Sequence, residues 1–571
     1  MIYRHQWRFI LDTILLGVVG AFSAQLFNYM LEASQYFFMT YLAGYTPLTL
    51  SESGEIISPV AGHYGMLLIP VVTTLGGIIS GVIIYSIAPE TEGHGTDTAV
   101  RAFHHAKGYI RPIVAPIKTL ASVITLGSGG SAGREGPTAL IAAGIGSIYA
   151  NLVNRSEEEK RLIMLVGMAS GLSAIFRSPI GTAIFAVEVL YSDMDFEGSA
   201  LLYTMIGSVV AYAVNGLFVG WQPLFHVPAG LEVNHFSDYF LYIVLGVGSG
   251  IIASILPNVF YGLRDIFHSF NKLPNHIKPA IGGLGVGIIA IMLPQVLGGG
   301  YGWIQQAING NIATSVLLIL VFAKMAAFSL TVSSGGSGGV FAPSLFVGSM
   351  LGGFFARLFD QPSAAFVVVG MAAVFGGAAR IPIATLLMVV EMTGGYTLLV
   401  PAALAVMLSY LVQTQITKRF KYKSLYEAQL PNESDSPAHH VKHLQTVLRL
   451  LGERKIDVPS YVNHVDLYSV LSAGIPVDVS GGKQLIIGVL REESSYVGKT
   501  IGSGYLKGIN QNGDSEEAEV IGIFRDGDLE LPHTETVLKE GDQVLLITSS
   551  DARKWLKSHV RRLSENDKYK N

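Results

Sequence analysis

Residues 162–180 read LIMLVGMASGLSAIFRSPI, and residues 365–383 read AFVVVGMAAVFGGAARIPI. The second stretch begins 203 positions after the first (162 to 365), and it keeps the Val-Gly-Met-Ala core, the arginine and the Pro-Ile ending at the same spacing. Ordinary Gly- and Ala-rich membrane packing also produces look-alike segments. A register held over the whole stretch instead indicates that the two halves of the chain are copies of one unit.

A glycine- and proline-containing segment precedes each copy. GREGPT at residues 133–138 matches GVFAPS at residues 339–344, with an offset of 206 positions (137 to 343). Paired helix starts interrupted by Gly or Pro are typical of transporters, in which half-helix N-termini surround an anion near the membrane midplane. The pattern therefore predicts an inverted-repeat transport protein.

The composition is that of a polytopic membrane protein, with 50% hydrophobic residues, 14% charged residues and 65 glycines. A net charge of −4 gives no basic surface for nucleic acid, and the absence of cysteine excludes disulfides and thiolate chemistry. The first residues run into an apolar stretch too long for a signal peptide. Arg4 and Arg8 precede this stretch, which favours a cytoplasmic N-terminus. We expect an integral protein of a bacterial or archaeal plasma membrane with both termini in the cytoplasm.

The apolar segments differ in length. Those long enough to cross a bilayer include residues 10–39, 65–88, 240–260 and 315–332. Segments such as 179–190 and 382–390 are too short to span alone. Short helices that stop partway are tolerated only around a protein-lined or wet cavity. We therefore expect an all-α membrane protein with re-entrant or short helices.

Two lysines, Lys118 and Lys324, lie inside apolar stretches, where a charge is costly. Near an anion pathway they would add positive potential. A lysine that snorkels to the interface or pairs with a carboxylate is the alternative.

The character of the chain changes at Leu430, where the polar linker PNESDSPAHH begins. A helical pattern follows at residues 443–454, and apolar runs typical of strands occupy residues 485–490, 520–524 and 543–547. We expect a membrane domain at 1–430, a linker and helix at 431–480, and a small soluble α+β domain at 481–565.

The candidate chemistry lies in four separated pieces: GHGTD at 93–97, GREGP at 133–137, GGVFAP at 338–343 and KSLY at 423–426. Glycine permits a close approach of the backbone, so that successive amides can converge on an ion. Glu135 would place a carboxylate where an anion binds, and its protonation would release that position. The alternative is that Glu135 only complements the positive end of its helix.

These pieces resemble the CLC family of chloride channels and chloride/proton exchangers, whose GSGIP, GREGP and GxFxP motifs occur in the same order. The resemblance covers most of residues 10–430 and implies a homodimer with one chloride pathway per subunit and Glu135 as the gate. It implies anion contacts from the amides of Val340 and Phe341 and the hydroxyl of Tyr426. The remaining expected anion-binding residues are His94, Gly133, Arg134 and Gly136.

Two departures from the family pattern matter. His94 replaces a serine, and imidazole can donate an N–H group and carry charge near pH 6.5, so anion binding should strengthen at low pH. Val189 stands where exchangers commonly carry a proton-accepting glutamate, which leaves Glu188 as the candidate for the proton path. We therefore expect passive, proton-gated chloride conduction, with secondary active chloride/proton antiport as the alternative.

The C-terminal part resembles the carboxy-terminal half of an RCK domain, as found on potassium-transport regulators, through residues 496–500, 520–527 and 540–546. Some bacterial domains of this type bind cyclic di-AMP between two copies. The resemblance makes Ile523, Arg525, Pro532 and His533 the candidate ligand contacts for cyclic di-AMP or another nucleotide. A ligand-free dimerisation module is the alternative that we favour.

Enzymatic functions find no support. Lys499 and Thr500 end a segment like a phosphate loop, but Glu493 stands where the first glycine is required. GSGGSA at 127–132 ends an apolar span rather than a strand, so it is no dinucleotide fingerprint. No metal site or cofactor is expected apart from bound chloride. A membrane receptor or scaffold controlled by the soluble domain is the alternative outside transport.

Overall fold

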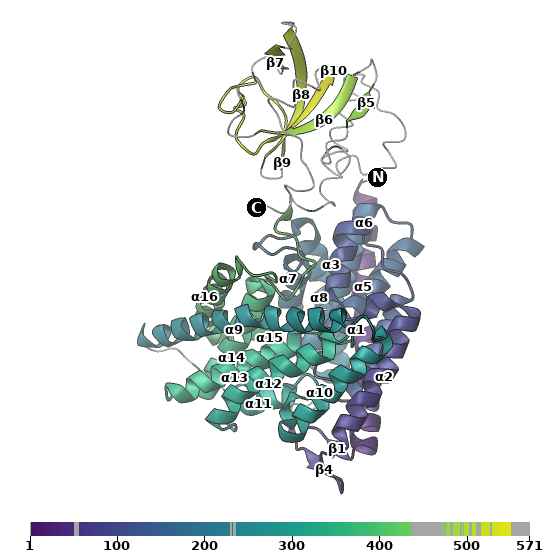
Figure 1. The fold of residues 1–571 in the computed structure, drawn as a ribbon, viewed down its shortest axis with the longest axis vertical. Coiled ribbons are helices and arrows are strands. Elements are labelled where there is room, and N and C mark those ends of the chain that lie inside the picture. The colour runs from purple at the N-terminus through teal and green to yellow at the C-terminus, as the bar shows by residue number, and fades with distance from the viewer. Residues whose placement is uncertain are drawn as a thin grey trace. The chain divides into compact units, whose positions relative to one another are not determined.

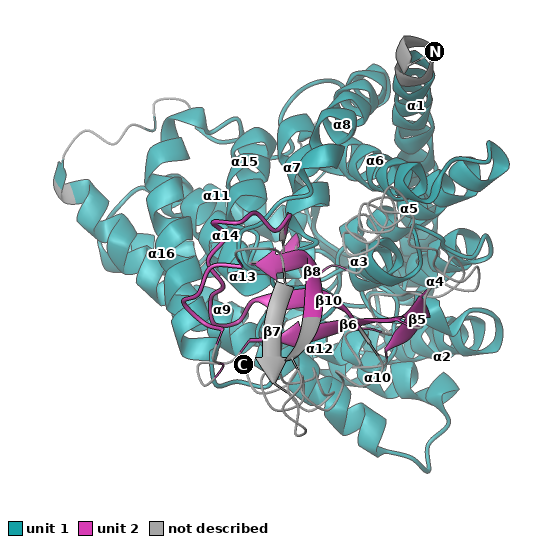
Figure 2. Cartoon of the chain, turned by 90° about the horizontal axis from the view of Figure 1, so that it is seen from above, with its two compact units in different colours: residues 1–431 teal, residues 432–571 magenta. Residues whose placement is uncertain are grey.

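The computed structural model of the chain describes residues 2–50, 56–228, 231, 236–433, 436, 471, 476–479, 483–490, 494, 496–501, 505–509, 515–525 and 528–549. The chain divides into two compact units, Met1–Pro431 and Asn432–Asn571, coloured separately in Figure 2. The first unit ends one residue after Leu430, where the sequence changes character. The helix expected at 443–454 lies outside the described residues.

Unit 1 is built from helices (Figure 1). They are α1 (Ile2–Gln35), α2 (Ile69–Ile87), α3 (Thr96–His105), α4 (Val114–Gly127), α5 (Glu135–Leu152), α6 (Glu157–Phe176), α7 (Pro179–Glu188), α8 (Gly198–Val219), α9 (Phe236–Ser269), α10 (Lys278–Met292), α11 (Tyr301–Ile308), α12 (Thr314–Ser333), α13 (Phe341–Leu358), α14 (Ser363–Ala379), α15 (Pro382–Thr393) and α16 (Leu399–Thr417). Among the described residues, eight helical segments are long and apolar enough to cross a membrane. The prediction of a polytopic helical protein is confirmed.

The short helices expected from the sequence are present. Helices α7 and α15 each begin with a proline in the first turn, where its missing N–H costs nothing. With 10 and 12 residues, they are too short to cross a bilayer. Their ends differ by two or three residues from the predicted segments.

The sequence repeat is also a repeat of packing. A side chain on Gly146 of α5 would collide with the carbonyl of Ile163 on α6, and one on Gly352 of α13 would collide with the carbonyl of Phe366 on α14. These contacts are equivalent in the two copies. Glycine is therefore needed at the same two places, because each helix pair packs backbone against backbone.

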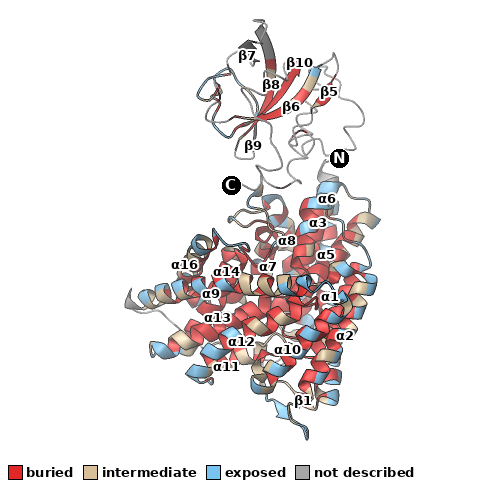
Figure 3. Cartoon of the chain, in the orientation of Figure 1, coloured by how far each residue is buried: buried red, intermediate tan, exposed pale blue. Residues whose placement is uncertain are grey.

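The most deeply buried helices carry the repeat. Every residue of α14 from Ala364 to Ala379 is buried, and α5 and α13 are buried over most of their length (Figure 3). The outer helices expose large apolar side chains, among them Leu202 and Leu217 of α8. Apolar exposure of this kind suits contact with lipid, which agrees with an integral membrane protein.

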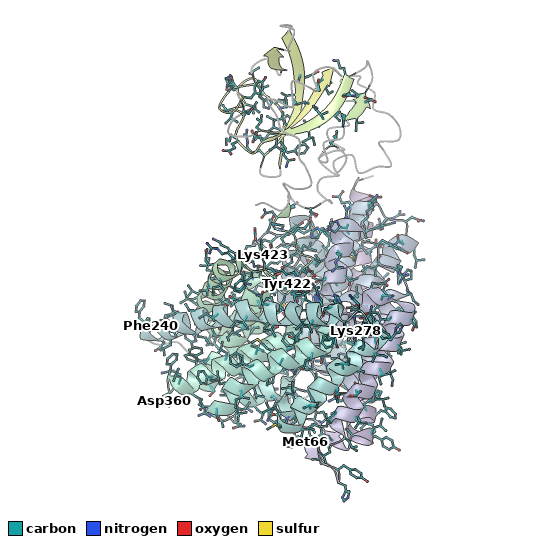
Figure 4. The ribbon with its side chains drawn as sticks, in the orientation of Figure 1. Met66, Phe240, Lys278, Asp360, Tyr422 and Lys423 are labelled. Carbon is teal, nitrogen blue, oxygen red and sulfur yellow. The ribbon has the colours of Figure 1, made fainter. Side chains whose placement is uncertain are left out.

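Two ends of unit 1 can be located in Figure 4, where Tyr422 and Lys423 lie at one end and Met66 at the opposite end. From Lys423 the chain returns inward, since Tyr426 is only 2% exposed.

Unit 1 also contains short antiparallel strand pairs, which join β1 (Tyr45–Thr46) to β4 (Val60–Ala61) and β2 (Thr49–Leu50) to β3 (Ile56–Ile57).

Unit 2 contains an antiparallel sheet with the order β5-β6-β10-β8-β7, and β9 pairs with β8. Its strands are β5 (Val477–Val479), β6 (Lys483–Val489), β7 (Tyr505–Ile509), β8 (Ser515–Arg525), β9 (Asp528–Glu530) and β10 (Gln543–Ser549). The three strands predicted from apolar runs are β6, β8 and β10, which are adjacent in the sheet. Val544 and Leu546, two positions apart in β10, belong to a buried apolar core on one face of the sheet, and Leu545 and Ile547 on the other face are buried as well.

Candidate functional site

Three glycine segments far apart in the sequence meet inside unit 1. Gly133 and Gly339 exchange backbone hydrogen bonds of 2.7 and 2.6 Å. Gly93 donates to the carbonyl of Gly336 at 3.2 Å and accepts from the amide of Gly338 at 3.3 Å. Backbone hydrogen bonds therefore hold the starts of α3, α5 and α13 together.

Two equivalent hydrogen bonds, from backbone amides to threonine hydroxyls, also hold these loops. The amide of Ser131 donates to Oγ1 of Thr331 at 2.9 Å, and the amide of Ser337 donates to Oγ1 of Thr125 at 3.4 Å. Each pair links one copy of the repeat to the other. The loops are thus fixed in relation to both halves of unit 1.

Glu135 is the first residue of α5, and its side chain is 1% exposed. Oε1 accepts a hydrogen bond from the hydroxyl of Tyr301, whereas Oε2 has no hydrogen-bond partner. The amide of Ala342, in the first turn of α13, faces the carboxylate. The first N–H groups of a helix lack partners within it, so the carboxylate lies where an anion would bind.

Tyr301 was not found from the sequence. It begins α11 directly after Gly300, whose φ of +82° favours glycine. Its ring stacks on Phe225 with 5.8 Å between centroids, and the guanidinium carbon of Arg134 lies 5.3 Å from the ring centroid. A signal was available, because GGGY at 298–301 repeats GHGT at 93–96 with an offset of 205 positions (93 to 298).

Arg134 and Tyr301 also line a cavity of ≈ 540 Å³. Other residues of its wall are Asn28, Glu32, Leu48, Gly129 and Gly298. The guanidinium of Arg134 donates to the side-chain carbonyl of Asn28, and its Nε has no hydrogen-bond partner. The cavity therefore presents a cation beside the tyrosine that holds Glu135.

The remaining predicted anion ligands lie among aromatic rings. Val340 is the N-cap of α13 and Phe341 its first residue. The ring of Phe341 packs against Phe176 at 4.3 Å and Phe375 at 4.1 Å between centroids. The ring of Tyr426 lies 5.5 Å from that of His94. Tyr426 and His94 are thus brought together, although 332 positions separate them (94 to 426).

His94 makes one polar side-chain contact. Its Nε2 lies 3.2 Å from Oδ2 of Asp97, while Nδ1 has no hydrogen-bond partner. Gly136, the residue after Glu135, lies against the backbone carbonyl of His94, so a side chain at Gly136 would collide there. The predicted anion-binding residues His94 and Gly136 are therefore neighbours.

Lys118 and Lys324 are repeat mates, 206 positions apart (118 to 324), and both are fully buried. The ammonium of Lys118 donates to the carbonyls of Thr91 at 3.0 Å and Gly93 at 2.7 Å. That of Lys324 donates to the carbonyls of Val296 at 2.8 Å and Gly298 at 2.6 Å. The lysines do not snorkel; each holds the loop that leads into α3 or α11.

Glu188 is buried at the end of α7, and its oxygens accept the amides of Ile383 at 3.1 Å and Ala384 at 2.6 Å. This contact gives Glu188 a role at a helix end, beside the place on a proton path expected from the sequence. Val189 is completely buried and has no titratable group. Val189 therefore offers no carboxylate to a proton path. The carboxylate of Glu188, next to it in the chain, is hydrogen-bonded to the start of α15.

The ligand candidates of unit 2 are not presented together. Ile523 is buried in the core of the sheet. Arg525 bonds to Asp542 at 2.9 and 2.8 Å, to Glu530 at 2.8 Å and to the carbonyl of Val537 at 2.7 Å. Pro532 is half-buried and His533 is exposed. The last two remain accessible, whereas Ile523 and Arg525 serve the domain itself.

Comparisons with known proteins found relatives of both units of the chain. The family model described as voltage gated chloride channel matches residues 76–414, and that of the TrkA-C domain matches residues 487–557. The H(+)/Cl(-) exchange transporters ClcA of Salmonella agona and Salmonella dublin are 30% identical to this chain over 368 residues, which make up 60% of this chain and 75% of each relative.

Solved structures share the fold of unit 1. A CLC-type fluoride/proton antiporter superposes with a TM-score of 0.63 at 22% identity, over 76% of this chain and 99% of that one. A slow cyanobacterial Cl-/H+ antiporter superposes with a TM-score of 0.63 at 20% identity, over 73% of this chain and 96% of that one.

Proposed function

Since the chain belongs to the voltage-gated chloride channel family, which is the CLC family, we propose that it exchanges chloride for protons across the membrane. This is the alternative that the sequence left open. The relatives at 30% identity are named H(+)/Cl(-) exchange transporters, which favours antiport over the passive conduction expected from Val189.

The observation that carries the proposal is the position of the Glu135 carboxylate. It faces the amide of Ala342 at the start of α13 and stands at the start of α5. Two helix N-termini together favour a negative charge between them. While ionised, Glu135 is itself the anion at this place. When it takes up a proton, its charge is lost and chloride can occupy the place.

Competition of this kind links the two ions. A proton on Glu135 and a chloride at the helix N-termini favour each other, because the proton removes the charge that excludes chloride. Such coupling is reciprocal, so bound chloride raises the proton affinity of Glu135 by the same factor by which a bound proton raises the chloride affinity. Glu135 would thereby alternate between holding a proton and blocking the anion.

The other ligands have separate tasks in this scheme. The amides of Val340 and Phe341 would donate to chloride, since they begin α13 and lack partners within the helix. The hydroxyl of Tyr426 would donate from the opposite side. Gly133 and Gly339 keep these groups at a fixed separation through their paired hydrogen bonds. Arg134 would attract anions into the adjacent cavity.

The assembly and the C-terminal domain extend the proposal. We infer a homodimer with one pathway per subunit and cytoplasmic termini, as the family resemblance implies. The TrkA-C domain would serve as a dimerisation module, and cyclic di-AMP is the ligand to test first. Any such ligand can change transport only through a difference in its affinity for two states of the protein.

Proton movement in proteoliposomes tests the exchange. An outward chloride gradient should drive proton uptake against a proton gradient in vesicles containing the unmodified protein. Glu135→Ala should move chloride without protons. Chloride flux that never drives protons uphill would instead support passive conduction, and absence of anion flux would reject transport.

A further inference from the structure

One ring nitrogen of His94 contacts a carboxylate, and the other has no hydrogen-bond partner. The side chain is 6% exposed, and its Nε2 lies 3.2 Å from Oδ2 of Asp97. Asp97 also accepts the amide of Ala428 at 3.2 Å and the hydroxyl of Tyr261 at 3.5 Å. A carboxylate surrounded by donors acts as an acceptor. The hydrogen of neutral His94 therefore resides on Nε2, and Nδ1 is left with an unshared lone pair.

A lone pair on Nδ1 is unsuited to an anion site. A neutral imidazole with its hydrogen on Nε2 can only accept at Nδ1, and an accepting atom repels chloride. Nδ1 is buried and has no hydrogen-bond partner. Uptake of one proton turns this nitrogen into a donor and gives the ring a positive charge, which the adjacent Asp97 neutralises.

The other groups around the ring permit this change. Tyr426 and Phe260 contribute neutral rings at 5.5 and 6.2 Å between centroids. Lys118 is occupied by the carbonyls of Thr91 and Gly93. Two other charges belong to Arg101, which faces Asp97, and to Glu135, the residue before Gly136. The carboxylates of Glu427 and Glu92 have partners of their own, Arg264 at 2.6 Å and His268 at 3.6 Å. Asp97 is thus the carboxylate in contact with His94.

We propose that His94, paired with Asp97, is a second proton-binding site of the anion pathway, and that its protonated Nδ1 donates to chloride. The inference rests on the proposed function and assigns it a further group. Chloride and a proton bind together at His94, whereas at Glu135 the ionised form competes with chloride. The site supplies a titratable group on the pathway, where Val189 has none and Glu188 is bonded to two amides of α15.

Calorimetry on the full-length protein in detergent measures the linkage directly. Sodium chloride is titrated into protein carrying Glu135→Gln, so that the gate no longer titrates. Between pH 5.5 and pH 8, the ordinary range of imidazole titration, chloride affinity should fall about tenfold, a typical size for coupled binding. Repeating the titration in buffers of different ionisation enthalpy should show proton uptake with each chloride bound.

The variant His94→Asn keeps one donor and one acceptor but cannot titrate. It should abolish both the pH dependence and the proton uptake, and His94→Ser should do the same if the first variant fails to fold. The matched control is His104→Asn, which changes a buried histidine within α3, bonded to the carbonyl of Leu190 at 3.1 Å. The control should keep both effects.

The result that overturns the site is a pH dependence or proton uptake that persists in His94→Asn and His94→Ser, or that is absent in the Glu135→Gln parent. Loss of both effects in the His104 control would also count against it. Binding is measured without transport, so failure of the exchange proposal is seen separately, as chloride flux that drives no protons.

Discussion

Glu188 and Glu391 each accept hydrogen bonds from the first turn of the helix that carries the other. Glu188, at the end of α7, accepts the amides of Ile383 and Ala384 in the first turn of α15. Glu391, near the end of α15, accepts the amides of Ile180 at 3.2 Å and Gly181 at 2.9 Å in the first turn of α7. The end of each helix therefore lies at the start of the other, so the two copies run antiparallel and the repeat is inverted.

This arrangement predicts that Glu188 stabilises the fold. Glu188→Ala leaves the buried amide of Ala384 and the half-buried amide of Ile383 unpaired, and should lower the stability of the protein by about 1–3 kcal/mol for each buried group. Glu391→Ala should have a comparable effect, because it holds the equivalent helix. Thermal unfolding in detergent measures both variants. If Glu188→Gln stops proton movement while leaving the unfolding temperature unchanged, Glu188 is a proton carrier rather than a helix cap.

Glu135 should control both pH dependence and proton coupling. Glu135→Gln and Glu135→Ala remove the charge that occupies the start of α13, so chloride efflux from liposomes should lose its gating by protons. The pH dependence that remains should be the one that His94 gives to chloride binding. Proton movement should cease in the same vesicles. A pH dependence of efflux that survives when Glu135→Ala is combined with His94→Asn would assign the gate to another group.

The hydroxyl of Tyr301 should set the pH at which this gate opens. A hydrogen bond to a charged group contributes about 1.5–3 kcal/mol, and its loss in Tyr301→Phe favours the protonated carboxylate. The midpoint of pH-dependent efflux should therefore move upward by roughly one to two pH units. The ring remains in place to stack on Phe225, so the fold should be retained.

A matched control for Tyr301 is Tyr422→Phe. Tyr422 also donates its hydroxyl to a carboxylate, that of Asp265 at 2.7 Å, and it begins the segment that returns inward to Tyr426. Its loss should leave the midpoint of efflux where it is. Equal midpoints for Tyr301→Phe and the unmodified protein would show that the hydroxyl does not hold the gate.

The two buried lysines should differ in their importance for folding. Lys324→Met leaves the carbonyls of Val296 and Gly298 without their donor, whereas after Lys118→Met the carbonyl of Thr91 keeps the hydroxyl of Ser337 and that of Gly93 keeps the amide of Gly338. Lys324→Met should therefore destabilise the protein by about 1–3 kcal/mol per unpaired carbonyl, and Lys118→Met by less. Detergent-resistant folded yield and unfolding temperature measure the effect. A stable Lys324→Met protein with reduced anion affinity would reveal an electrostatic role instead.

Removal of unit 2 should separate transport from regulation. A chain ending at Leu430 should keep its anion selectivity in liposomes, because the described anion ligands all belong to unit 1. If cyclic di-AMP binds the full-length protein, His533→Ala should weaken binding, whereas Arg525→Ala should destabilise unit 2 by removing its bonds to Asp542 and Glu530. Unaltered ligand affinity in His533→Ala would place the ligand elsewhere.

The sequence by itself determined the repeat, the membrane character, the two units and the positions of the anion motifs. These follow from local rules: apolar length, a proline in a first helical turn, and glycine where two backbones touch. Gly146 and Gly352 illustrate the reason, because close packing admits no side chain at either position. A requirement so strict leaves a visible pattern in the sequence.

Only the tertiary structure decided which partners the polar groups take. Tyr301 reaches Glu135 across 166 positions, Glu188 reaches Ala384 across 196, and Lys324 finds carbonyls rather than a carboxylate. A buried polar side chain must find a hydrogen-bond partner, but many groups can satisfy it. The identity of that partner depends on the packing of helices distant in the chain, and residue type does not encode it.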